Sequence, residues 1–373
     1  MNSAAPVAAV GFTRIWRVYL VPAGVFQSLM IGGGYGTGRE IVEYFSRFGF
    51  IGGLLGLALT AGCFALLLVI SFELARRYCA YDYRSFFRVL LGRGWIAFEL
   101  LYVTMFALVV AVVAAASAAL VQQYLHLPGI VGVATLLLLV IVFAFYGRAW
   151  VTGVLAYKAL ILSAVFLIYF VIVLSRSSGR IAAQWQAHEV VSGWALAAVR
   201  YCLYSSVVIP AMLFATRTIE TRNEAAVAGV SSAALGLVPA ALLHLSFGAG
   251  YPQIKAQTIP LYWMISSLKL PLLTGAYLAI LFGSLFDVGI GFIQSINERI
   301  DGWSMERRGQ HVSRSVRAGI ALGCLLLSGA LAQLGIVRLI AEGYGTLAYG
   351  FLILFVIPLL TVGMYRILRP ATA

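Results

Sequence analysis

Long apolar stretches, each about as long as a bilayer is thick, are the feature that most constrains this chain. A helix needs about 20 mostly apolar residues to cross the hydrocarbon layer. Apolar residues make up 62% of the 373 residues and charged residues only 10%, which is too little polar surface for a compact soluble core. This composition argues against a soluble enzyme, a disordered protein and a nucleic-acid-binding domain. It predicts an all-α polytopic membrane protein.

About ten spanning helices are predicted, five on each side of a polar external linker. The linker is 175–193, and it separates a first repeat, 1–174, from a second repeat, 194–373, within a single membrane domain. An odd number of spans in each half inverts the second half relative to the first. The predicted spans are 17–38, 50–75, 95–123, 129–146, 149–174, 194–215, 225–247, 271–296, 318–335 and 346–367.

The basic residues predict the orientation in the membrane. With both termini in the cytoplasm, 17 of the 26 Lys and Arg residues fall in cytoplasmic segments and 7 in outer segments, as the positive-inside rule requires. The formal charge of +13 is therefore interpreted as a topology signal for a bacterial cytoplasmic (inner) membrane. The expected partners are the lipid bilayer and a small-molecule substrate, not nucleic acid, and the oligomeric state stays open.

Two predicted spans are interrupted at matching places. The first contains Gly32–Gly38, in which five of seven residues are glycine, and the sixth contains Tyr204–Pro210. The two breaks lie 178 residues apart, close to half of the chain. Paired discontinuous helices of this kind predict a secondary transporter with inverted repeats. Close helix packing through small residues is the alternative for Gly32–Gly38. A similar string, Gly343–Thr346, opens the last span and is interpreted as a turn.

A family resemblance rests on the first of these motifs. The run Ser28–Ile41, SLMIGGGYGTGREI, resembles the first helix of the YkvI-like bacterial membrane proteins. These proteins belong to the amino acid–polyamine–organocation (APC) superfamily and share the LeuT fold. Supporting similarities are Tyr204–Ser206, Tyr251–Pro252, Ile259–Tyr262 and Asn297–Ile300. The resemblance implies a LeuT-like arrangement of five plus five helices with discontinuous first and sixth helices.

The resemblance also implies a substrate site between the first, third, sixth and eighth helices. In that site the amides near Gly33 and Gly34 would face a substrate carboxylate, since free helix N–H groups attract anions. Hydroxyl and aromatic contacts would come from the same run and from the sixth span. Ordinary interhelical hydrogen bonding is the alternative for the tyrosines and serines. The candidate substrate-binding residues are Gly33, Gly34, Tyr35, Gly36, Thr37, Gly38, Tyr204, Ser205 and Ser206.

Ionisable residues inside spans are candidates for ion coupling, because an unpaired charge in the bilayer is costly. Lys158 lies in the fifth span and Asp287 in the eighth. By resemblance, a sodium site would use the carbonyls of Ser28 and Ile31 and side chains near Ser284 and Asp287. A Lys158–Asp287 proton switch is the competing interpretation, which puts sodium coupling in doubt. A static ion pair and a snorkelling lysine are the bland alternatives.

Other charged residues near the breaks have simpler interpretations. Glu40 is predicted to point inward, with Arg200 as its partner or as a contact for a substrate carboxylate. Arg39, Glu43 and Arg47 are spaced as a solvated stripe of weak ion pairs. The amphipathic segment 82–90 is predicted to lie on the bilayer surface.

The predicted function is proton- or sodium-coupled symport of a small amino-acid-like solute by alternating access. The chain shows no catalytic motif, so it is not expected to be an enzyme, and no metal site or cofactor beyond a coupling H+ or Na+ is expected. The alternatives are a sensor or channel with a transporter fold and an intramembrane enzyme acting on lipid-linked substrates.

Overall fold

The chain folds into helices that are long enough to cross a membrane. The computed structural model describes residues 14–31, 33–146, 148–279, 281–283 and 313–369, and the single residues 285, 288 and 304. Within this part of the chain every regular element is a helix. Five helices there are long and apolar enough to span a bilayer, and one bent pair makes a sixth. The prediction of an all-α polytopic membrane protein is confirmed.

The described helices overlap the predicted spans, but part of the eighth, 271–296, lies outside the described residues. Those of the first half are η1 (Trp16–Leu20), α2 (Val21–Met30), α3 (Gly33–Thr37), α4 (Arg39–Tyr44), α5 (Phe50–Tyr78), α6 (Tyr83–Leu91), α7 (Trp95–Leu120), α8 (Gly129–Tyr146) and α9 (Arg148–Ala187). Those of the second half are α10 (Trp194–Ser205), α11 (Val208–Met212), η5 (Leu213–Thr216), α12 (Arg222–Phe247), η7 (Gln253–Ala256), α13 (Pro260–Ser267), α15 (Arg314–Ala332), α16 (Ile336–Arg338), η8 (Leu339–Tyr344), α17 (Gly345–Phe351), η9 (Leu352–Val356), η10 (Leu359–Gly363) and α18 (Met364–Leu368).

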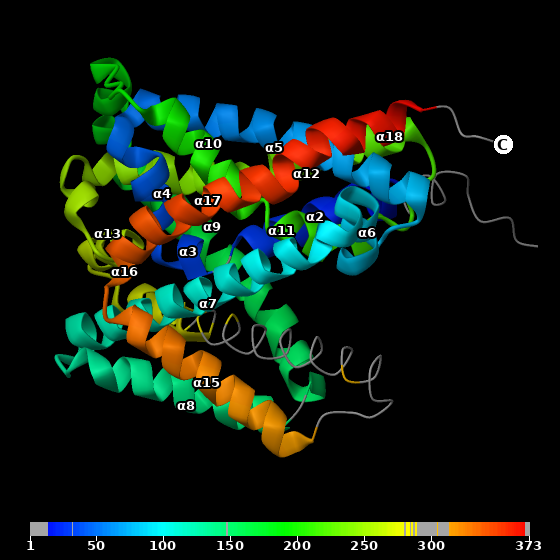
Figure 1. Ribbon diagram of the computed structural model, residues 1–373. Coiled ribbons are helices and arrows are strands. Elements are labelled where there is room, and N and C mark those ends of the chain that lie inside the picture. The colour runs from blue at the N-terminus through cyan, green and yellow to red at the C-terminus, as the bar shows by residue number, and fades with distance from the viewer. Residues whose placement is uncertain are drawn as a thin grey trace, which may run out of the picture.

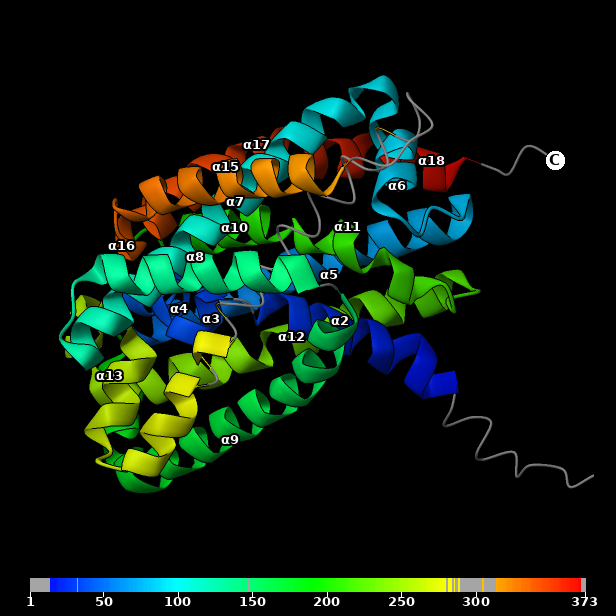
Figure 2. The same cartoon turned by 90° about the horizontal axis from the view of Figure 1, so that it is seen from below.

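The long helices pack in two groups. In the first group α12 lies along α5 and α2, and α10 also packs on α5. In the second group α7 packs against α8 and α15. Helices α8 and α15 form the lowest layer in Figure 1. Figure 2 shows α9 along the outer side of α12, with which it is also in contact. The two groups meet along α7 and the broken first helix.

Glycines allow the helices of the first group to approach closely. A Cβ atom added to Gly229 of α12 would lie 2.7 Å from the backbone nitrogen of Val69 in α5. One added to Gly236 would lie 2.3 Å from the ring of Phe26 in α2. Close backbone approach through small residues is how membrane helices gain packing energy, since lipid is as apolar as the helix surface.

The segment predicted as a linker, 175–193, is largely helical. α9 continues through it to Ala187 and bends at Ser177, whose φ and ψ are −134° and 18°. The chain then turns at Gly193, where φ is +92°, and enters α10.

α6 does not present its apolar face to the bilayer as predicted. Phe86 and Phe87 are fully buried, and the Phe87 ring stacks on Phe98 of α7 at a centroid distance of 3.7 Å. The Asp82 side chain caps the helix by accepting a hydrogen bond of 2.9 Å from the Ser85 amide. The amphipathic pattern was correct, but the protein itself covers the apolar face.

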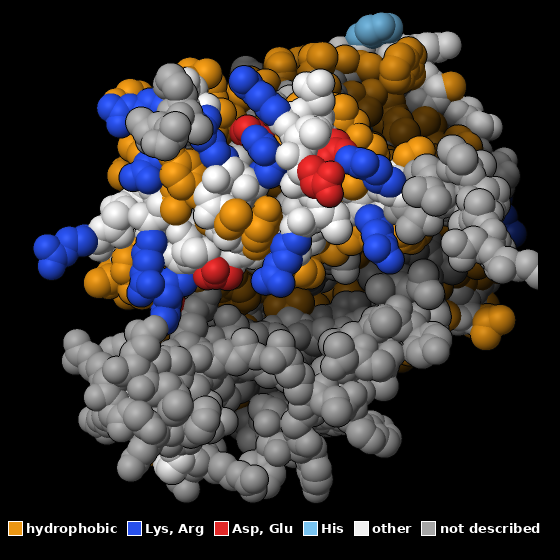
Figure 3. Space-filling model, turned by 90° about the vertical axis from the view of Figure 1, so that its right-hand side faces the viewer, with side chains coloured by type: hydrophobic (Ala, Val, Ile, Leu, Met, Phe, Trp, Pro, Cys, Tyr) orange, Lys and Arg blue, Asp and Glu red, His pale blue; other side chains and the backbone are white. Residues whose placement is uncertain are grey.

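Arginines gather at one end of the helix bundle, which we call the α18 end. There the Arg77 guanidinium donates to the carbonyls of Ile367 and Arg369, so the end of α5 and the end of α18 are adjacent. Figure 3 looks onto this end and shows Lys and Arg side chains spread across it. The opposite end, which carries α13 and α16 in Figure 1, is called the α13 end. The basic residues near the chain ends and adjoining turns are Arg14, Arg76, Arg77, Arg217, Arg222, Arg366 and Arg369.

Candidate functional site

The first spanning helix is broken twice. α2 ends at Met30, and Ile31 leaves the helical conformation with φ −77° and ψ 43°. The short helix α3 follows, and Gly38 then adopts φ +75° before α4 begins. The predicted interruption is therefore real, but it contains one short helix instead of a continuous unwound stretch.

The sixth spanning helix is also broken, just before Pro210. α10 and the α11–η5 segment meet at an angle of 43° around Ser206 and Val207. Proline lacks the N–H that would bond to the Ser206 carbonyl, and its ring clashes with the preceding turn. The Ser206 hydroxyl donates a hydrogen bond of 2.6 Å to the Leu203 carbonyl. The break thus follows from the position of the proline.

A cavity of about 100 Å³ lies where the two broken helices face α7 and the last spanning helix. Its walls come from the two helix groups, so it lies at the surface along which they meet. Its lining residues are Leu29, Met30 and Glu40 of the first helix, Tyr201, Tyr204, Ser205, Val207 and Val208 of the sixth, Met105, Val109, Val112 and Val113 of α7, and Tyr344 of η8.

Glu40 is the acidic residue of this cavity. Its side chain belongs to a residue that is only 8% exposed, and it forms no ion pair within the described part of the chain. The neighbouring arginines of the same helix, Arg39 and Arg47, both pair with Glu43 instead. A carboxylate at this depth requires compensation by polar groups, water or a ligand.

Aromatic rings surround the carboxylate. The Tyr204 ring lies 5.4 Å from that of Tyr201 and 4.8 Å from that of Tyr344, centroid to centroid. All three tyrosines line the cavity together with Glu40. The Tyr204 hydroxyl is buried and lies beside the Glu40 carboxyl group. The Tyr201 hydroxyl donates to that of Tyr35 at 2.7 Å.

The predicted substrate residues divide into two sets. Tyr204 and Ser205 line the cavity, whereas its described lining does not include Tyr35, Gly36, Thr37, Gly38 or Ser206. Within the run Gly33–Gly38 the Tyr35 hydroxyl contacts Tyr201, and the Thr37 hydroxyl accepts a hydrogen bond of 3.2 Å from the Arg39 amide. The Gly36 carbonyl accepts one of 2.7 Å from the Tyr277 hydroxyl. A role for the Gly33 and Gly34 amides stays a prediction.

The candidate coupling residues are only partly visible. Ser28 of α2 is exposed, and Ile31 lines a second cavity of about 220 Å³ with Gln27, Tyr169 and Pro239. The backbone of Lys158 lies in α9, but its side chain is outside the described set, as are Ser284 and Asp287. The Lys158–Asp287 pair and the sodium site both stay predictions.

Of the stripe Arg39, Glu43, Arg47, only Arg47 is solvated as predicted. Arg39 and Glu43 are 6% and 7% exposed, and their side chains pair at 2.8 Å. The Arg39 Nη1 atom also donates to the carbonyls of Lys255 and Gln257, at 3.2 and 3.0 Å. The loop before α13 therefore covers the stripe and fixes α4 at the α13 end. We call this set, Arg39, Glu43 and the two carbonyls, the Arg39 clamp.

Two further polar contacts border the clamp. The Lys255 ammonium lies 3.3 Å from the Glu189 carboxylate, in the turn before α10. Burial opposes the charged form of Lys255, but hydrogen bonds with Tyr251 and Glu189 outweigh it and raise the pKa of Lys255.

The predicted Glu40–Arg200 pair is absent in this structure, because the Arg200 guanidinium donates to the Tyr349 hydroxyl at 2.6 Å.

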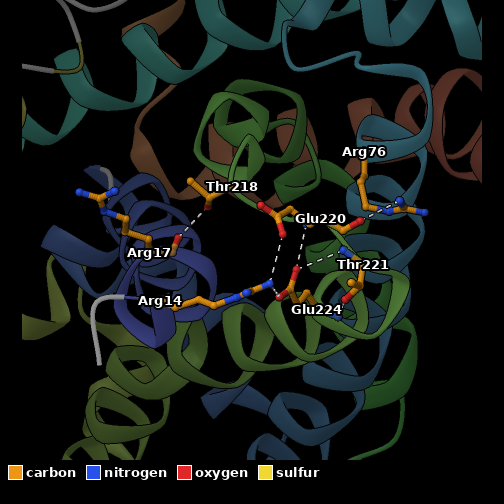
Figure 4. A network of polar contacts seen from close by, with 7 residues as sticks. All are labelled: Arg14, Arg17, Arg76, Thr218, Glu220, Thr221 and Glu224. Carbon is orange, nitrogen blue, oxygen red and sulfur yellow. Dashed lines mark hydrogen bonds and ion pairs between the residues drawn. The ribbon is translucent and has the colours of Figure 1, made fainter. Parts of the chain in front are cut away.

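An ion pair ties the two broken helices together at the α18 end (Figure 4). The Arg14 guanidinium lies 2.7 Å from Glu224 and 3.2 Å from Glu220. The Glu224 carboxylate also accepts hydrogen bonds from the backbone amides of Glu220 and Thr221, at 2.9 and 3.1 Å. We call Arg14, Glu220 and Glu224 the Arg14 anchor. It joins the start of the first helix to the turn that follows the sixth.

With this geometry established, comparison with known proteins adds a relative. No family model matches the chain. The uncharacterized membrane protein YkvI of Bacillus subtilis is 25% identical over 344 residues, which cover 88% of this chain and 91% of YkvI. The chain resembles YkvI along nearly its whole length. The resemblance predicted from the first-helix motif is confirmed.

Solved structures show the same fold. A Na+-coupled sialic acid symporter, in a substrate-bound outward-open state, superposes with a TM-score of 0.62 at 12% identity, over 91% of this chain and 78% of the symporter. The manganese transporter of Eremococcus coleocola gives a TM-score of 0.60 at 16% identity, over 96% of this chain and 81% of the transporter. This chain therefore has the LeuT-like architecture that its resemblance to the YkvI-like proteins implied.

Sequence reasoning missed two of the cavity tyrosines. Tyr201 precedes Tyr204 by three residues, which places both on one face of α10, and this spacing was an available signal. Tyr344 belongs to the string Gly343–Thr346, which was interpreted as a turn. The structure places it instead in the π-helix η8, which continues directly into α17.

Proposed function

We propose that this protein is a secondary active transporter that moves a small amino-acid-like solute across the bacterial cytoplasmic membrane by alternating access. The observation that carries the proposal is the shared cavity of the two broken helices, with the buried Glu40 in its wall. Broken helices that meet at a midplane site are the architecture of transporters with inverted repeats. The two solved structures named above are transporters and not enzymes, which supports this assignment.

The packing of the helices supports alternating access. One wall of the cavity belongs to the group of α2, α5, α10 and α12, and the other to α7. A rotation of one group against the other would open the cavity to either end of the bundle. The Arg39 clamp holds α4 to the loop before α13, so this contact would have to open for access from the α13 end.

We further propose coupling to H+ or Na+, with both termini in the cytoplasm. Lys158 in α9 is the candidate for proton coupling, and the carbonyls of Ser28 and Ile31 are candidates for a Na+ site. The other residues proposed for this coupling site, Ser284 and Asp287, lie outside the described residues. The amides of Gly33 and Gly34 remain the proposed contact for a substrate carboxylate.

Uptake into proteoliposomes tests the function. The purified protein should accumulate a labelled amino acid or organic amine when an inward proton or sodium gradient is imposed, and not when the gradient is dissipated. Failure of every tested amino acid, amine and nucleobase to accumulate under either gradient would contradict the proposal. Ligand binding without any uptake would instead favour a sensor with this fold.

Two lysine variants distinguish proton coupling from sodium coupling. The Lys158→Ala variant should lose the pH dependence of uptake. The matched control is Lys269→Ala, because Lys269 is exposed in the loop after α13 and lies far from α9 in the sequence. Unchanged pH dependence in the Lys158 variant would exclude the proton-switch role of that residue.

A further inference from the structure

The chemistry of the cavity wall is strongly asymmetric in charge. Its described lining contains one carboxylate, that of Glu40, and no Lys, Arg or His. The arginines closest to it in sequence pair with Glu43, and Arg200 contacts Tyr349. Within the described lining, a ligand entering this space therefore meets an acidic group without a basic partner.

Tyrosine faces and hydroxyls flank the same carboxylate. Tyr204 is 3% exposed, and its ring packs between those of Tyr201 and Tyr344. Its buried hydroxyl lies beside the Glu40 carboxyl group. The face of an aromatic ring attracts cations and repels anions, most strongly where water is excluded. The aromatic and acidic groups thus favour the same sign of ligand charge.

The opposite wall is apolar. It consists of Met105 and three valines of α7, and Val208 continues it on the sixth helix. Such a wall holds a compact hydrocarbon body but offers no partner for a second charged group, and a buried charge without a partner is costly.

We propose that this cavity binds a small organic ammonium ion, with its nitrogen beside Glu40 and the rings of Tyr201, Tyr204 and Tyr344, and its hydrocarbon part against α7. The proposal narrows the amino-acid-like solute proposed above to an organic amine without a carboxylate, so it makes no use of the Gly33 and Gly34 amides. It rests on the transporter function only for the step of transport. The binding chemistry follows from the cavity alone.

Binding to the purified protein tests the proposal without any transport. The probes are size-matched sets, each with an ammonium ion, the neutral alcohol and the carboxylate on the same carbon chain, from propyl to hexyl and including choline as a quaternary ammonium. Isothermal titration calorimetry should show binding of at least one ammonium ion. The alcohol and the carboxylate of the same set should bind at least about tenfold more weakly.

Variants assign the binding to this cavity. Glu40→Gln keeps the shape but removes the charge, and it should weaken ammonium binding about thirtyfold or more, as expected when one member of a buried charge pair is lost. Glu40→Asp should keep the preference for ammonium. Tyr204→Phe keeps the ring and should bind within a few-fold of the wild type, whereas Tyr204→Leu should lose about tenfold. The control is Glu342→Gln, since the Glu342 side chain is 66% exposed.

Several outcomes would overturn the proposal. These are ammonium binding that Glu40→Gln leaves unchanged in a variant with wild-type thermal stability, a carboxylate or alcohol that binds as tightly as its ammonium, or no binding by any ammonium probe. Gradient-driven uptake of an acidic solute would overturn this inference and leave the transporter function intact. Glu40-dependent ammonium binding without any uptake would support this inference and contradict the transporter function.

Discussion

Gly38 is the residue that allows the first helix to change direction between α3 and α4. Its φ of +75° lies in the left-handed region, which costs a residue with a side chain about 1–2 kcal/mol. A Cβ atom there would also lie 2.7 Å from the Phe247 ring and 3.2 Å from Leu261. The position therefore excludes other residues for two independent reasons.

We expect Gly38→Ala to destabilise the protein more than the backbone strain alone explains. The predicted loss is about 3 kcal/mol, from strain and overpacking together, measured as a shift in thermal unfolding in detergent. Gly193→Ala is the control, because Gly193 has a similar backbone conformation, with φ +92° and ψ −4°, and its Cβ position would meet only the Phe48 ring at an ordinary 3.4 Å. Equal losses in the two variants would show that crowding by Phe247 is unimportant.

Arg39 and Arg47 both pair with the Glu43 carboxylate, but their side chains differ in exposure. Removing a buried member of an ion pair leaves an uncompensated charge and costs about 3–5 kcal/mol, whereas exposed pairs are worth about 1 kcal/mol or less. The Arg39 side chain is 8% exposed and that of Arg47 is 51% exposed. The Arg39 clamp should therefore depend on one arginine far more than on the other.

Arg39→Gln should lower the unfolding temperature clearly, and Arg47→Gln should change it little. The two variants should also differ in the rate at which a protease cleaves the loop before α13. Only Arg39→Gln removes the contacts between that loop and an arginine, so only this variant should be cleaved faster. Comparable stability of the two variants would mean that the carbonyls of Lys255 and Gln257 contribute nothing to the closure.

At the scale of elements, the sequence predicted the positions of the helices but not their contacts. Apolar length and the Pro210 kink are local properties, so the span ranges and the break in the sixth helix were accessible. The burial of α6 and of Arg39 depends on partners distant in the chain, Phe355 and the 253–257 loop. Tyr344 was missed for the same reason, because a glycine-rich string has no local signal for a π-helix.

The packing of α12 on α5 provides a test at this scale. Gly229→Ala should destabilise the protein by about 1–3 kcal/mol, because the added methyl would meet the rigid backbone of Val69. Gly62→Ala in α5 is the control, since its Cβ position has no neighbour within 4 Å, and alanine there should be neutral or stabilising. If both substitutions stabilise the protein, the two helices are not held as closely as described.

For the whole molecule, the accumulation of arginines at the α18 end carries the proposed orientation. The end of α5, with Arg76 and Arg77, belongs to this basic surface, and Cys79 follows it directly and is exposed. Cys202 is buried, and Cys63 and Cys324 are half-buried in their helices. Cys79 is therefore a native reporter for the side of the membrane on which this end lies.

A membrane-impermeant maleimide should label Cys79 in inside-out vesicles and not in intact spheroplasts, as the positive-inside rule predicts. The Cys79→Ser variant should lose the labelling and so identify the site. Labelling from the outside of spheroplasts would reverse the orientation and, with it, the direction in which the Arg39 clamp opens.

The Arg14 anchor has a consequence for how fast this protein can work. Since Arg14 precedes the first helix and Glu224 lies in the first turn of α12, the anchor helps α2 and α12 to move as one body within their group. The Arg14 side chain is 58% exposed, so dissolved ions screen this contact, unlike those inside the membrane. Turnover should therefore slow as salt loosens this joint between α2 and α12, while the affinity of the Glu40 cavity stays insensitive to salt.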